Sequence, residues 1–162
     1  MVQKRRDPLL LQDSERNRRM RRSQVHSVLH RVSYISKGNS DLTRKVDQVI
    51  GKPYFLHAVG PDAFDCLGLV GHLLGFRVEF RAAYLRRLFA MAKGQLEPGD
   101  MLLWDDPRKG PARMAGAHVA LYECGLTIVD SSPMVGVSRS SLSDAVDHLG
   151  EPRVFRMKPC QP

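Results

Sequence analysis

The feature of this 162-residue chain that most constrains its fold is a cysteine at the start of an apolar segment. The segment Phe64–Val70 (FDCLGLV) follows an irregular, glycine-containing approach at Val59–Asp62. Leucine and valine then recur at helical spacing until Gly75, a residue type that commonly ends helices. The pattern predicts a helix with Cys66 in its first turn, where unpaired backbone N–H groups and the helix dipole favour the thiolate.

A single helical cysteine is more often an inert core residue than a nucleophile, so Cys66 needs partners. Ala117–Tyr122 and Leu126–Ser131 have the residue pattern of two strands joined by a turn. If that turn is a three-residue loop with Gly125 in the left-handed conformation, His118 lies directly opposite Asp130. We therefore predict Cys66 as nucleophile, His118 as base and Asp130 as the carboxylate that orients the imidazole.

The remaining periodicities predict a mixture of helices and antiparallel strands. Helices are expected from about Ser40 to Ile50, ended by Gly51, over Arg81–Lys93 and over Ser141–Leu149. Extended segments are expected at Phe76–Phe80, Met101–Trp104, Gly136–Ser138 and Arg153–Met157, with a polar loop at Pro107–Gly116. The predicted fold class is α+β, with the Cys66 helix packed on an antiparallel sheet.

The net charge of +8 belongs to the N-terminal part of the chain. Residues 1–45 contain twelve basic and four acidic side chains, whereas residues 46–162 contain thirteen of each. Ser14–Val32 has the spacing of an amphipathic helix with an apolar stripe (Val25, Val28, Leu29 and Val32). We divide the chain into a basic arm, residues 1–40, and a globular domain, residues 41–162. The arm is either a solvated tail, a docking element for another protein, or a segment that binds a polyanion such as nucleic acid.

Other classes of protein are disfavoured by the composition. The three cysteines, at positions 66, 124 and 160, form no CxxC pair or zinc-type spacing, so we expect no metal and no cofactor. No apolar run reaches membrane-spanning length, and the start of the chain does not have the pattern of a signal peptide. Stacking surfaces for nucleic acid also need aromatic residues among the basic ones, and the arm lacks that pattern.

Four motifs resemble, in order and separation, the signature of the NlpC/P60 cysteine peptidases. They are Pro53-Tyr54, Phe64–Val70, Leu96–Asp100 and Gly116–Tyr122. The resemblance covers about residues 41–158. It implies a papain-like α+β fold and cleavage of the peptide stems of bacterial cell wall. The family typically has Ser after the cysteine and often His as the third residue, where this chain has Leu67 and Asp130.

The resemblance also implies roles for individual residues. Cys66 would be the nucleophile, His118 the base and Asp130 the third polar residue. Tyr54 would stand beside the thiol, Asp65 would shape the substrate side, and the loop of His57 would pass near the mouth of the site.

Details of these motifs are similar to the branch of the family found in bacteriophage tail tips. That similarity implies a virion component, made in the host cytoplasm, whose basic arm contacts tail or baseplate proteins. Two other functions remain open: a structural tail-tip or plug protein that keeps the fold without catalysis, and a nucleic-acid-binding protein that works through the arm.

Overall fold

The computed structural model describes residues 40–79, 82–105 and 118–159. The predicted arm helix, the Pro107–Gly116 loop and Cys160 lie outside the described residues. Among the described residues, no helix is long and apolar enough to cross a membrane.

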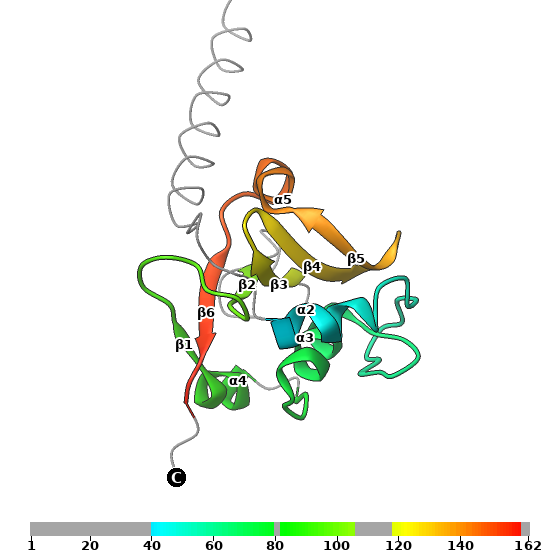
Figure 1. Ribbon diagram of the computed structural model, residues 1–162. Coiled ribbons are helices and arrows are strands. Elements are labelled where there is room, and N and C mark those ends of the chain that lie inside the picture. Colours follow the sequence, from blue (N-terminus) through cyan, green and yellow to red (C-terminus); the bar gives the residue numbers. More distant parts are fainter. Residues whose placement is uncertain (1–39, 80–81, 106–117, 160–162) are drawn as a thin grey trace, which may run out of the picture.

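The centre of the structure is one six-stranded antiparallel sheet (Figure 1). Its strands are β1 (Phe89–Met91), β2 (Met101–Trp104), β3 (His118–Cys124), β4 (Thr127–Ser132), β5 (Gly136–Ser141) and β6 (Arg153–Met157). They lie in the order β1-β6-β2-β3-β4-β5, so the last strand of the chain is inserted between β1 and β2. The strands β2 to β5 form the meander that the turns of the sequence predict.

Helices cover both faces of this sheet. The helices are α2 (Ser40–Asp47), α3 (Cys66–Leu74), α4 (Ala82–Leu88) and α5 (Leu142–Leu149), and Figure 1 shows α2 and α3 on the side opposite α5. Along β2, Met101 and Leu103 belong to the core under α3, whereas Leu102 and Trp104 belong to the core under α5. Alternate residues of a strand point to opposite faces, so a fully apolar strand fits a sheet covered on both sides. The α+β prediction is confirmed.

One of the helix predictions is wrong in its length. The helix expected over Arg81–Lys93 ends at Leu88, because the chain leaves α4 to form β1, which pairs with Phe155–Met157 of β6. Backbone pairing with the sheet therefore outweighs helical periodicity there. The Phe76–Phe80 segment forms no strand over its described residues, 76–79.

The turn between β3 and β4 also differs from the prediction. It contains Gly125 and Leu126 rather than three residues, and the register shifts between Tyr122 and Cys124. Asp130 consequently pairs with Ala120, two residues beyond the predicted partner His118. His118 and Asp130 are diagonal neighbours on one face, a separation that long side chains still span.

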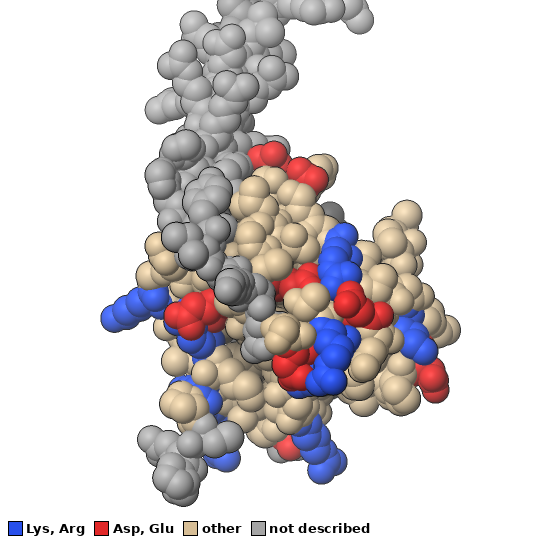
Figure 2. Space-filling view, viewed as in Figure 1, with Lys and Arg blue, Asp and Glu red and all other residues tan. Residues whose placement is uncertain are grey.

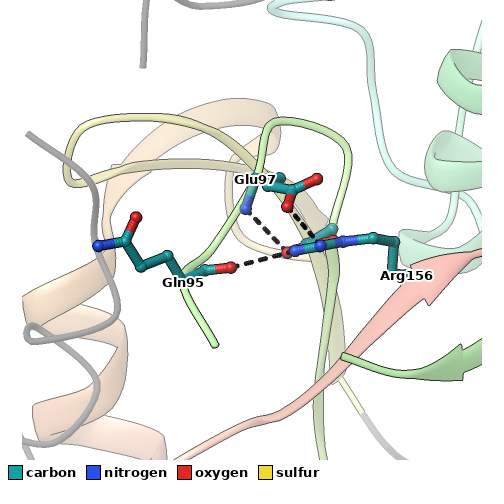
Figure 3. A network of polar contacts seen from close by, with 4 residues as sticks. Gln95, Glu97 and Arg156 are labelled. Carbon is teal, nitrogen blue, oxygen red and sulfur yellow. Dashed lines mark hydrogen bonds and ion pairs between the residues drawn. The ribbon is translucent and has the colours of Figure 1, made fainter. Parts of the chain in front are cut away.

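Ion pairs connect segments that are distant in sequence. Arg156 on β6 donates two hydrogen bonds to Asp100, at 2.8 Å each, and also contacts Glu97 and the carbonyl of Gln95 (Figure 3). These contacts fix the turn before β2 to β6.

A second guanidinium, on β5, links the sheet to α2. Arg139 donates to both oxygens of Glu123, at 2.7 and 2.9 Å, and to Asp47 at 2.7 Å. On the face shown in Figure 2, basic and acidic side chains of the described residues mix around α2 rather than gathering by sign. This mixture agrees with the balanced charge of residues 46–162.

Candidate active site

The site is built at the start of α3, and Asp65 is the residue that starts the helix. Asp65 is extended (φ −85°, ψ 177°), and its Oδ1 accepts the Gly68 N–H at 2.6 Å. Its Oδ2 accepts the His57 N–H at 2.9 Å, and the residue is 3% exposed. A carboxylate at this position accepts a hydrogen bond from an otherwise unpaired N–H group at the helix start, and the positive end of the helix dipole stabilises its negative charge. Cys66 is therefore the first residue of a well-capped helix.

The loop before the helix lies directly on its first turn. The carbonyl oxygen of Ala58 accepts the Asp65 N–H at 2.8 Å, and a Cβ at Gly68 would lie 2.0 Å from that same oxygen. Only glycine allows this approach, because real Cβ atoms do not come so close to a carbonyl oxygen. Gly68 thereby allows the loop at Ala58 to lie directly against the first turn of α3.

The strand hairpin brings the predicted base and carboxylate together. Nε2 of His118 lies 3.0 Å from Oδ2 of Asp130, and the two side chains are 29% and 13% exposed. The second oxygen of Asp130 accepts a hydrogen bond from the Ser140 hydroxyl at 3.2 Å. Because Nε2 faces the carboxylate, Nδ1 is the ring nitrogen left for the thiol.

The electrostatic environment favours the protonated imidazole. Burial is the largest single effect on His118 and opposes its charge, but hydrogen bonds with Asp130 and with Cys66, together with their negative charges, outweigh it. These contacts raise the pKa of His118 to about 9. A cationic imidazole beside a cysteine favours the thiolate, which is the nucleophilic form.

Tyr54 and His57 belong to the same surroundings. Burial raises the pKa of Tyr54, and the negative charges of Cys66 and Asp65 raise it further. His57 is exposed, has a left-handed backbone (φ 65°), and is joined to the site through its main-chain bond to Asp65. The structure thus brings all six predicted residues to one region, while their contacts with substrate stay predictions.

Leu67, the residue that follows the cysteine, is buried. It is 8% exposed and belongs to the core under α3.

Sequence reasoning missed two serines that support this region. Ser140 contacts Asp130, and Ser131, which is fully buried, donates from Oγ to the Phe64 carbonyl at 2.8 Å. A signal for Ser131 exists, because the alternation of β4 puts it on the same core face as Val129. A buried hydroxyl on an apolar face needs a hydrogen-bond partner.

No group of three or more His, Cys, Asp or Glu residues suited to a metal ion occurs in the described part of the chain. The other described cysteine, Cys124, is a free thiol at the far end of β3.

No protein-family model matches the sequence, and no curated protein matches it. Solved structures do, and they define the class: the chain has the fold of NlpC/P60 proteins, as predicted.

Three of these structures illustrate the similarity. The NlpC/P60 domain of the peptidoglycan hydrolase SagA has 21% identity and a TM-score of 0.51, over 72% of this chain and 95% of that domain. An NlpC/P60 family protein from Bacillus cereus has 20% identity and a TM-score of 0.58, over 72% of this chain and 38% of its own. NlpC1 from Trichomonas vaginalis has 17% identity and a TM-score of 0.57, over 77% of this chain and 46% of its own. The chain thus spans less than half the length of the last two proteins.

Proposed function

We propose that this protein is a cysteine endopeptidase that cleaves the peptide stems of bacterial cell wall. The observation that carries the proposal is the 3.0 Å contact between His118 and Asp130 beside Cys66 at the start of α3. It supplies a nucleophile, a base and an orienting carboxylate. The similarity to the NlpC/P60 domain of a peptidoglycan hydrolase supports the choice of substrate.

In the proposed reaction, the Cys66 thiolate attacks the carbonyl carbon of the scissile peptide bond. Backbone N–H groups at the start of α3 have no intrahelical acceptor and would stabilise the resulting oxyanion. The His118 imidazolium then gives its proton to the leaving amine, the C–N bond breaks, and a thioester forms. Water attacks the thioester, His118 takes up a proton from that water, and the product acid leaves as the thiol is restored.

Tyr54, Asp65 and His57 are proposed to form the substrate side of the site. Both oxygens of Asp65 already accept backbone N–H groups, so its contribution would be to hold the shape of the loop. Tyr54 is half-buried and feels the charge of Cys66, and we propose that its hydroxyl contacts the peptide. Which peptide bond is cut follows from the masses of the products.

We further propose that the enzyme works as a component of a bacteriophage tail tip, attached to tail or baseplate proteins through residues 1–40. The support is the motif similarity to that branch of the family and the concentration of basic residues in the arm. Mass spectrometry of purified particles of a phage whose genome encodes the protein should find it in the tail fraction. Particles that lack it entirely would overturn this setting while leaving the chemistry untouched.

The decisive experiment is digestion of purified peptidoglycan, with product masses, by the wild-type chain and by Cys66→Ala. We expect stem-peptide fragments from the wild type and none from the variant. The structural plug remains the second candidate from the sequence, and the preserved contacts of Cys66, His118 and Asp130 favour the enzyme over it. A folded wild type that releases nothing between pH 6 and about 9, the range in which His118 holds its proton, would favour the plug.

A further inference from the structure

Two consecutive residues of β4 reach toward different members of the candidate site. Asp130 contacts the His118 ring, and Ser131, which alternation places on the opposite face, donates from Oγ to the carbonyl of Phe64 at 2.8 Å. Ser131 is completely buried. Phe64 lies 67 positions earlier in the chain and two residues before Cys66.

Phe64 is the point where the loop before α3 is held. Its N–H donates to Pro53 at 3.1 Å, and its carbonyl also accepts the Phe55 N–H at 3.3 Å. Its fully buried ring lies 5.0 Å from that of His72 and fills the space where a Cβ at Gly60 would be. Of the two bonds to the carbonyl, the one from Ser131 is the shorter and is the one that joins the loop to the sheet.

The order of residues along the chain links this bond to the thiol. Phe64 is followed at once by Asp65, which caps α3, and then by Cys66. A displaced Phe64 carbonyl would move the cap and the thiol together, while His118 would stay with Asp130. The distance between thiol and imidazole therefore depends on a bond that involves neither side chain.

We propose that Ser131 is a positioning residue that sets the separation of Cys66 and His118, so that one strand locates both. This inference rests on the proposed function, in which those two residues form the reactive pair. The simpler possibility is a buried hydroxyl that only needs a partner, in which case its loss would lower stability without changing the chemistry of the thiol.

Alkylation of Cys66 by iodoacetamide between pH 5 and 10, read by peptide mass, distinguishes a positioning role of Ser131 from a purely stabilising one. The reaction needs no cell-wall substrate, so it reports on the thiol directly. In the wild type we expect fast alkylation at pH 6 to 7. Ser131→Ala should lower that rate about tenfold and move the profile toward an ordinary thiol, near pH 8.5. The matched control is Val146→Ala, which removes a buried side chain from the core under α5 and should lower the Tm without changing the profile.

Ser131→Thr keeps the hydroxyl donor and should keep the wild-type profile, even where its extra methyl group lowers the Tm. A folded Ser131→Ala protein with an unchanged profile would overturn the inference and leave the proposed function standing. If the alanine variant does not fold, a folded threonine variant with a shifted profile would overturn it instead. An ordinary profile in the wild type would overturn the catalytic pair, and this inference with it.

Discussion

Two regions of the molecule hold a cationic side chain against an aspartate, and they differ in what the cation can do. At the candidate active site His118 lies 3.0 Å from Asp130, which is 13% exposed. On β6 Arg156 makes two 2.8 Å bonds to Asp100, which is 1% exposed. The imidazole has a pKa near 9 and can release its proton, whereas hydrogen bonding to Asp100 raises the already high pKa of Arg156 further.

This difference in proton release determines which of the two pairs can take part in a reaction. A guanidinium keeps its proton at every pH at which the protein is folded, so the Arg156 pair can only fix the turn before β2 to β6. An imidazole that loses its proton near pH 9 can give and take protons beside a thiol. An aspartate paired with a guanidinium thus gives a permanent structural contact, and an aspartate paired with an imidazole gives a reactive one.

The largest expected effect comes from removing the nucleophile. Cys66→Ala should lower cleavage of stem peptides by about a thousandfold or more while leaving the Tm nearly unchanged, because the residue is small and partly exposed. His118→Ala should be nearly as damaging. Cys66 should also be the only one of the three cysteines that is alkylated rapidly near neutral pH. Equal labelling of Cys124 and Cys160, or an active alanine variant, contradicts the assignment.

Asp130 should have the next largest effect, and its variants test why the His118 pKa is raised. Asp130→Ala should lower kcat/KM by about a hundredfold, and Asp130→Asn by less, because the amide oxygen still accepts the imidazole N–H. The imidazolium protonates the leaving amine, so wild-type activity should persist below pH 9 and fall above it. Without the Asp130 contacts, burial lowers the pKa of His118 and the high-pH limb should move toward neutral pH. Equal pH–rate profiles for the wild type, Asp130→Ala and Asp130→Asn would mean that another group orients His118.

The contrasting pair should affect stability and not chemistry. Asp100→Ala leaves Arg156 without its main partner and should reduce the free energy of unfolding by about 2 to 3 kcal/mol, less than for a fully buried pair because Arg156 is one-third exposed. Glu97→Gln, at an exposed position in the same network, should change it by under about 0.5 kcal/mol. Denaturant unfolding measures the stability of the two variants, and peptide hydrolysis measures their activity. A large loss of kcat in folded Asp100→Ala protein would remove the distinction between the two regions.

The parts that sequence could predict are those set by short stretches of chain. Cys66 at the start of a helix, Asp65 before it and Gly75 after it are local signals, and α3 runs as they indicate. The strand at Met101–Trp104 likewise follows from a run of apolar residues after a turn, and the strand at Arg153–Met157 contains the β-favouring pair Val154 and Phe155. The pairing of His118 with Asp130 was also predictable, although through the wrong register.

What sequence could not predict depends on contacts between distant segments. The hairpin register differs from the prediction because the turn contains Gly125 and Leu126 rather than three residues, and because the pairing shifts again between Tyr122 and Cys124. The helix expected over Arg81–Lys93 stops because β6, more than sixty residues later, offers a pairing edge to Phe89–Met91. The bond from Ser131 to Phe64 crosses 67 positions, so a strand serine becomes informative only when the fold is known.

The smallest expected effect on catalysis comes from removing the basic arm. A chain that starts at Ser40, the first residue of α2, lacks ten basic and three acidic side chains and retains the balanced charge of the domain. It should hydrolyse soluble stem peptides at about the wild-type rate, within twofold. It should bind an anionic polymer or the tail partner much more weakly, with a difference that shrinks as salt screens the charges.

The apolar stripe of the arm decides which of these two partners the arm serves. Docking on a protein should survive moderate salt and fail when Val28 and Leu29 are replaced by aspartate, because burial of apolar side chains is insensitive to ionic strength. Adhesion to a polyanion should instead be lost in salt, and the double replacement should weaken it only through its two added negative charges. Binding at several salt concentrations, with the soluble-peptide rate as control, measures both. An insoluble or inactive chain after truncation at Ser40 would mean that the arm packs on the domain and that the division at residue 40 is wrong.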